Sequence, residues 1–173
     1  SSATSSEAMA KEEYRLNALY GLREKAKEEA ERVLAQAMRA LQEEQARLEE
    51  MQAELERMIA SRKAKAKEYA EKQMRGEMTA QSMISAQSYL ERLKEQEQAQ
   101  ERTIEGQHRV IEQRENEVGR ARQGLAEATQ ELKALEKHKE KWEKEQKRKK
   151  QLKEEELLDE LAQTIHLGKS REN

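Results

Sequence analysis

The chain has 173 residues, of which 40% are charged and 3% are aromatic, and it contains no proline, phenylalanine or cysteine. This composition excludes an ordinary aromatic core, a disulfide framework and thiol chemistry. A formal net charge of −2 predicts no general attraction to nucleic acid or membranes. The dominant residues are strong helix formers, so we expect long helices rather than disorder. No membrane-span-length apolar run and no signal-peptide pattern is visible, so the sequence predicts an intracellular protein without membrane insertion.

The first element is expected over residues 9–75. The preceding segment, "SSATSSEA", is small and polar, so residues 1–8 are expected to be a disordered tail or a remnant of cloning, with Met9 as a native start. Farther along, leucines recur every seven residues, at Leu34, Leu41, Leu48 and Leu55. Ala37, Met51 and Met58 occupy the interleaved row, which Glu44 interrupts. This spacing is typical of a coiled-coil seam.

The charge then thins out in "MRGEMTAQSMISA" at residues 74–86. We expect a turn over residues 76–82, because Gly76 can adopt positive φ at a helix end. Either Thr79 or Ser82 can cap the helix that follows.

A second helix is expected over residues 83–151. Its apolar positions share one heptad register: Leu90, Leu93, Ile104, Ile111, Val118, Ala121, Leu125, Ala128, Leu132, Leu135 and Trp142. Polar residues interrupt this seam at Glu97, Gln100, Gln107 and Arg114. The two seams predict an all-α fold, a long two-helix antiparallel coiled-coil hairpin.

Folding the chain at residues 79 and 80 sets an explicit register. Leu34 then faces Leu125, Leu41 faces Val118, Leu48 faces Ile111, and Leu55 faces Ile104. The same alignment pairs Arg62 with Glu97 and brings Glu44 within one residue of Arg114. Such polar layers more often fix register than add stability.

Residues 152–173 have no segment opposite them and are predicted to form a helical overhang with a frayed end. Its face of Leu158, Leu161 and Ile165 is expected to contact another protein. The preceding run, residues 137–153, is strongly basic. It fits either a solvated helix face with i, i+4 ion pairs or a contact with an anionic partner, of which a protein is favoured over nucleic acid because interleaved aromatics are missing.

Enzyme chemistry has no visible basis in this sequence. A catalytic site needs a concave, partly dry pocket, which a two-helix hairpin is not expected to supply. His108, His138 and His166 are widely spaced, and no metal-binding, cofactor or phosphate-loop motif occurs. We therefore expect no catalytic, cofactor or metal site.

Two segments carry a family resemblance. Residues 14–51 begin with Tyr14, Arg15 and Leu16 and continue with Leu19, Leu22 and Arg23, and this opening resembles the flagellar export protein FliJ. The "LDEL" at residues 158–161 resembles that family's closing pattern. The size and layout are also similar to the injectisome proteins of the YscO and CdsO type, and the chain length favours that branch.

The resemblance implies a stalk protein of a type III secretion or flagellar export apparatus. It would dock in the hexameric export ATPase, promote its activity and contact the export-gate membrane protein. Secretion chaperones are further implied partners, and the implied location is the cytoplasmic base of the apparatus. A generic coiled-coil scaffold, a peripheral-stalk subunit and a helical arm of a nucleic-acid enzyme, like that of seryl-tRNA synthetase, remain alternatives.

The resemblance also places two contacts. The paired ends are expected to meet the ATPase through Tyr14, Leu16, Trp142, Lys147, Arg148, Lys149, Lys150, Leu158, Leu161 and Ile165. The export gate is expected to meet Met78, Ile84 and Tyr89 near the turn. Met83 is expected to pack into the seam, because it continues the Leu90 register.

Overall fold

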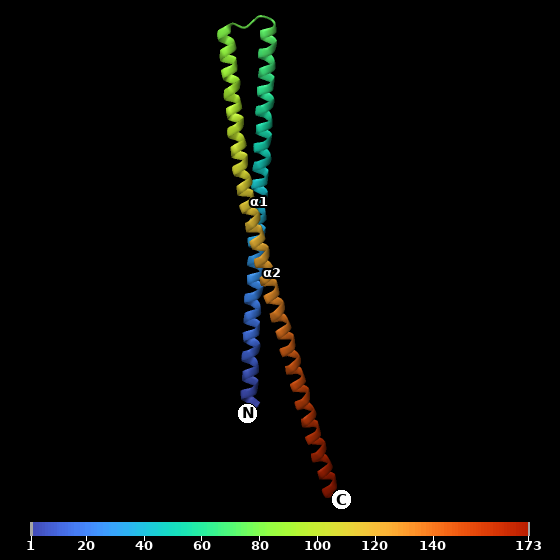
Figure 1. Ribbon diagram of the computed structural model, residues 1–173. Coiled ribbons are helices and arrows are strands. Elements are labelled where there is room, and N and C mark those ends of the chain that lie inside the picture. Colours follow the sequence, from blue (N-terminus) through green and yellow to red (C-terminus); the bar gives the residue numbers. More distant parts are fainter. Residues whose placement is uncertain (1, 173) are drawn as a thin grey trace. The chain divides into compact units, whose positions relative to one another are not determined.

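The computed structural model describes residues 2–172, with side chains from residue 4 onward. Two long helices, α1 (Ser2–Met74) and α2 (Ala80–Glu172), pack against each other, and the described residues contain no strand (Figure 1). The predicted all-α helical hairpin is confirmed. The apolar stripe of each helix explains the packing, because a single amphipathic helix would leave that stripe in water and pairing covers it.

The helices extend beyond their predicted limits. Residues 2–8 belong to α1, although the sequence suggested a disordered tail there, and Ser1 lies outside the described residues. Alanine and glutamate in this segment favour continuation of the helix. At the other end α2 continues to Glu172, so the described residues show no frayed end, and Asn173 lies outside them.

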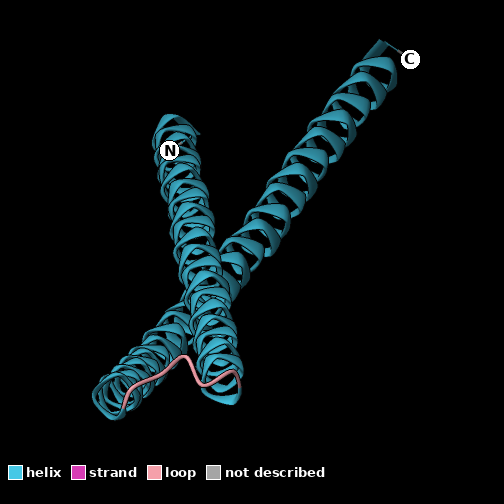
Figure 2. Cartoon of the chain, turned by 90° about the horizontal axis from the view of Figure 1, so that it is seen from above, coloured by secondary structure: helices cyan, strands magenta, loops and turns pink. Residues whose placement is uncertain are grey.

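The chain divides into two compact units. The end unit pairs α1 up to Ala30 with α2 from Gly124 onward, and the turn unit comprises Glu31–Gln123. Within the end unit the two helices diverge toward the chain termini (Figures 1 and 2).

The core of the turn unit is one narrow seam. Leu34, Leu41, Leu48 and Leu55 are half-buried on α1. On α2, covered positions alternate by three and four residues, with Leu90, Ile104, Ile111, Val118 and Ala121 among them. This spacing is the heptad pattern, which keeps one side of each helix toward its partner. In the end unit Leu132 is buried and Leu125 is half-buried.

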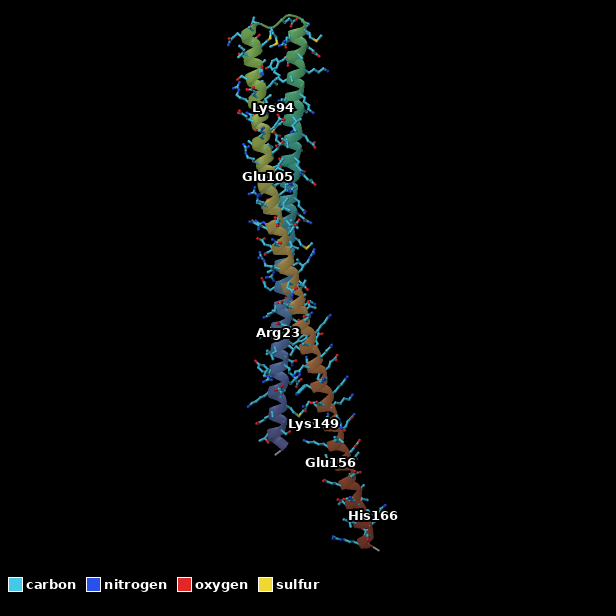
Figure 3. All side chains as sticks on the ribbon, in the orientation of Figure 1. Arg23, Lys94, Glu105, Lys149, Glu156 and His166 are labelled. Atoms are coloured by element: carbon cyan, nitrogen blue, oxygen red, sulfur yellow. The ribbon has the colours of Figure 1, made fainter. Side chains whose placement is uncertain are left out.

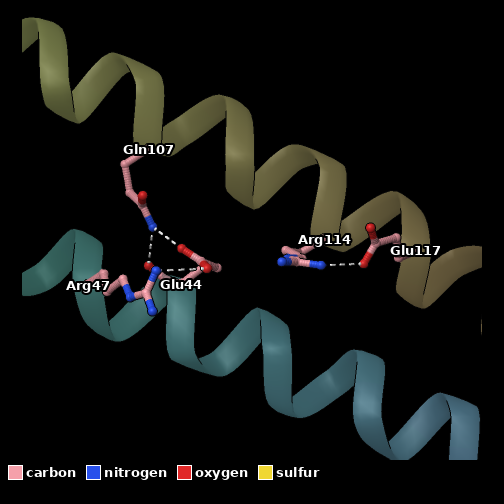
Figure 4. Close-up of polar contacts among 5 residues, drawn as sticks. All are labelled: Glu44, Arg47, Gln107, Arg114 and Glu117. Atoms are coloured by element: carbon pink, nitrogen blue, oxygen red, sulfur yellow. Dashed lines mark hydrogen bonds and ion pairs between the residues drawn. The ribbon is translucent and has the colours of Figure 1, made fainter.

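Polar side chains fill several layers of this seam. Arg62 donates from Nε to Glu97 at 2.7 Å, and this is the predicted pairing. Glu44, however, accepts from Gln107 rather than from Arg114. Gln107 Nε2 lies 2.7 Å from Glu44 Oε2 and 2.9 Å from the Glu44 carbonyl oxygen (Figure 4).

The expected pairing of Glu44 with Arg114 is thus wrong, whereas the expected pairing of Arg62 with Glu97 holds. Arg114 Nη1 bonds Glu117 at 3.0 Å on its own helix instead. This bond raises the pKa of Arg114, to which the charges of Glu44 and Glu43 add from across the seam. A side chain in one seam can reach neighbouring positions on the facing helix, so its partner is the polar group that best satisfies its hydrogen bonds.

The end unit has polar contacts at its margin. Arg23 pairs with Glu131 at 2.7 Å, and the Tyr20 hydroxyl donates to Glu136 at 3.3 Å. Lys139 lies 5.3 Å from the centre of the Tyr20 ring. Desolvation, with the charges of Glu24 and Glu136, raises the pKa of Tyr20. These contacts are largely exposed, so each contributes little to stability.

Residues 75–79 form the turn (Figure 2). Gly76 has φ of 70°, and the amides of Gly76 and Glu77 donate to the carbonyls of Gln73 and Lys72. This is the Schellman arrangement, in which glycine in the left-handed conformation ends a helix. Thr79 then caps α2: its hydroxyl accepts from the Ser82 amide at 3.0 Å, and the Ser82 hydroxyl accepts from the Thr79 amide at 2.8 Å. This reciprocal cap starts α2 three residues before the expected position.

Candidate partner-binding surfaces

The first candidate surface surrounds the turn. Met74 is 89% exposed, Ile84 is 64% exposed, and Met83 and Tyr89 are each 37% exposed. Tyr89 also lies beside Arg92, whose guanidinium carbon is 5.8 Å from the ring centre. We call Met74, Met83, Ile84 and Tyr89 the turn surface. Their shared feature is exposure near the turn, which makes them accessible to a partner protein.

A cavity of about 510 Å³ lies beneath part of this surface. Its lining includes Ala66, Ala86 and Leu90, together with both Met78 and Met83. Small alanines facing each other leave this space, because they do not span the distance between the two helices. Met78 is half-buried here, whereas the sequence placed it in the exposed patch and Met83 in the seam. Met74, which the sequence did not single out, is the more exposed of these methionines.

Charged side chains of α1 form a small network in the turn unit, next in sequence to residues that line this cavity. Glu68 lies 3.3 Å from Lys65 and 3.4 Å from Lys72. Hydrogen bonds from these lysines hold the pKa of Glu68 below its ordinary value, and the bond to Glu68 raises the pKa of Lys65. Lys65 also lies 5.5 Å from the centre of the Tyr69 ring.

The second candidate surface is the C-terminal part of α2. Every residue from Lys147 to Glu172 is exposed, a stretch of about 40 Å at 1.5 Å per residue. This overhang, residues 147–172, includes His166 and Glu156 (Figure 3). Leu152 is 49% exposed, and the large apolar side chains beyond it are all more than half exposed: Leu157, Leu158, Leu161, Ile165 and Leu167. An amphipathic helix with an uncovered apolar face is a ready docking element for a partner.

This apolar face is not the continuation of the hairpin seam. At about 100° per residue, the mean direction of Leu158, Leu161 and Ile165 is rotated roughly 100° around α2 from that of Trp142 and Gln146. Lengthening α1 would therefore leave these side chains uncovered. A partner must approach them from another side.

The remaining predicted end residues differ in their accessibility. Tyr14 is 78% exposed, and the basic run of Lys147, Arg148, Lys149 and Lys150 is exposed. Trp142 is half-buried. Leu16, expected at the ATPase contact, is only 2% exposed and belongs to the core. Its contribution is therefore to hold the end unit together.

Two other kinds of site, a metal centre and a membrane span, are not found among the described residues. No three His, Cys, Asp or Glu side chains between residues 4 and 172 are grouped to hold a metal ion. None of the described helix segments has the length and apolarity needed to cross a bilayer. The fold is a helical hairpin with exposed apolar side chains near the turn and along the C-terminal part of α2.

The comparisons with known proteins specify this class further. The model of the family described as "YscO-like protein" matches residues 11–172, and the chain belongs to this family of type III secretion stalk proteins. A solved structure described as a candidate YscO homolog, CT670 from Chlamydia trachomatis, has the same fold, with a TM-score of 0.80 at 22% identity. The match covers 91% of this chain and 97% of that one. The search of curated proteins finds no match.

Family membership confirms the resemblance seen in the sequence. It supports a type III secretion role over a generic scaffold or an arm of a nucleic-acid enzyme. The YscO-like family is a stalk-type secretion family and not a known enzyme family.

Proposed function

We propose that this protein is the central stalk of a type III secretion apparatus. In this proposal the end unit docks in the hexameric export ATPase and promotes its activity, and the turn unit contacts the cytoplasmic domain of the export gate. The protein then works in the cytoplasm at the base of the apparatus, where secretion chaperones are further partners. Membership of the YscO-like family supports this role.

The exposed overhang carries the ATPase part of the proposal. Its apolar side chains, including Leu158, Leu161 and Ile165, have no cover within the described chain. Burying one such side chain contributes about 1.5–3 kcal/mol, so a docking surface on the ATPase has a substantial driving force. The adjacent basic run adds an electrostatic contribution that should weaken with salt.

The turn surface supports the gate contact. Ile84 and Tyr89 are among its accessible side chains, and both were expected there from the sequence. Met78 lies in the cavity wall instead, so its part in the contact is to support the surface from beneath.

Stimulation of the purified ATPase tests the first contact. A Leu158→Gln, Leu161→Gln, Ile165→Gln variant should keep its helicity and lose most stimulation of phosphate release. A matched control changes the polar side of the overhang, with Asp159→Gln, Gln163→Glu and Ser170→Gln, and should stimulate as the unmodified protein does. Full stimulation by the triple glutamine variant would show that the overhang is not the ATPase contact.

Binding to the isolated cytoplasmic gate domain tests the second contact. Ile84→Ser with Tyr89→Ser should weaken binding by at least about tenfold, because each change removes an exposed apolar anchor. Ser85→Ala with Ser88→Ala is the control on neighbouring exposed positions and should bind normally. Unchanged gate binding by the first variant, with ATPase stimulation intact, contradicts the assignment.

A further inference from the structure

A groove opens between the two helices where they diverge within the end unit. Its volume is about 860 Å³, and its lining comes from residues 5–12 of α1 and residues 142–156 of α2. We call it the end groove. The α2 part of the lining extends for about 20 Å, the length of roughly four helical turns.

The floor of the end groove is apolar and contains one unsatisfied polar atom. Met9, Trp142 and Leu152 contribute to its lining. Gln146 lies among them, and its Oε1 atom is buried without a donor from any described residue. Buried acceptors are nearly always paired in folded proteins, so this atom is poised for a donor from outside the chain.

The rim of the groove is basic. Lys147, Lys149, Lys150 and Lys153 line it, against two acidic residues, Glu156 on the same helix and Glu12 on α1 (Figure 3). Within the described part of the chain no ion pair of at most 4.0 Å is recorded for these four lysines. Their positive charge is therefore available to carboxylates on a partner.

We propose that the end groove binds a single amphipathic α-helix of a partner protein, with an apolar face flanked by carboxylates. The apolar face covers Trp142, Met9 and Leu152, a side-chain donor reaches Gln146 Oε1, and the flanking carboxylates pair with the lysine rim. A third helix fits because the groove is elongated and lies between two diverging helices.

The apolar floor distinguishes this occupant from other polyanions. A phosphate backbone or a lipid headgroup surface would meet the lysines and leave Trp142 and Leu152 uncovered, and only one tryptophan is present to stack on bases. The groove shares Leu152 and the basic run with the overhang, whereas Leu158, Leu161 and Ile165 do not line it. This proposal stands whether or not the ATPase is the protein's partner.

Tryptophan fluorescence of the full chain provides a direct test, because Trp142 is the sole tryptophan and lines the groove. The probe is a synthetic amphipathic helix of about four turns. Leucines form one face around a central asparagine, and glutamates flank them. A twin peptide carries lysine in place of every glutamate. We expect a saturable blue shift with the acidic probe, weakened by salt, and none with the twin.

Two charge variants locate the site. Lys147→Glu with Lys150→Glu should weaken probe binding at least about tenfold, because two charge-assisted contacts become repulsive. Lys141→Glu with Lys144→Glu makes the same change in net charge outside the groove and should alter binding less than about twofold. Both pairs are exposed, so circular dichroism should show unchanged helicity.

A second readout measures probe binding without relying on tryptophan fluorescence. Anisotropy of a labelled probe on Trp142→Phe should still show binding, since Phe retains an apolar floor. Absence of a saturable shift, equal binding of the lysine twin, or equal losses in the two charge variants would overturn the proposal. A stronger salt-dependent shift with anionic vesicles or single-stranded DNA would overturn it in favour of those ligands.

Discussion

Replacing Gln107 by leucine should destabilise the hairpin, although leucine is the usual seam residue. Gln107 and Glu44 are each 7% exposed, and the Gln107 amide donates twice to Glu44. The leucine variant leaves one buried carboxylate oxygen without this donor. Arg47 contacts the other oxygen at 3.3 Å from a largely exposed position.

The magnitude follows from opposing contributions. Losing a hydrogen bond to a charged group costs about 1.5–3 kcal/mol, whereas the Glu44 carbonyl keeps its bond within α1 and adds no comparable cost. The new leucine recovers roughly 1–2 kcal/mol through apolar burial. We therefore expect a net loss of about 1 kcal/mol in the free energy of unfolding.

Urea unfolding followed by circular dichroism measures this change. The double variant Glu44→Leu, Gln107→Leu should be as stable as the unmodified protein or more so, because buried polar pairs rarely exceed apolar packing in stability. The non-additivity identifies the pair as coupled. If Gln107→Leu alone is as stable as the unmodified protein, the two side chains are not partners in solution and the described layer is wrong.

Three further outcomes test α2, the turn and α1. Gly119→Ala should stabilise the folded protein by about 1 kcal/mol, because its added Cβ meets no atom within 4 Å. Gly76→Ala should destabilise it by about 1 kcal/mol, because Gly76 has φ of 70°, and similar shifts in the urea midpoint for both variants would contradict this. Thr79→Ala should cost about 1 kcal/mol by removing the α2 cap, and Thr79→Ser should restore most of it in the same assay. Glu68 has a lowered pKa through Lys65, so it stabilises the folded state above its unfolded pKa and loses this effect as pH falls through the folded value. Glu68→Gln should accordingly reduce the loss of stability between about pH 6 and about pH 3, and an unchanged pH profile would exclude this contribution.

The sequence by itself was sufficient for the helices, the turn and the seam positions. Heptad spacing of Leu34, Leu41, Leu48 and Leu55 depends only on local periodicity, which a helix converts directly into a face. Gly76 and Thr79 define the turn through backbone preferences that act over a few residues. The family resemblance also rested on local patterns at residues 14–51 and 153–166.

Tertiary packing decided which residues meet and which remain accessible. Glu44 pairs with Gln107 rather than Arg114, because the Gln107 amide reaches its carboxylate while Arg114 bonds Glu117 on its own helix. Leu16 is buried by the opposing helix, although its own sequence context suggested a contact surface. The end groove exists only because two helices distant in sequence diverge around Trp142, and local sequence carries no measure of that separation.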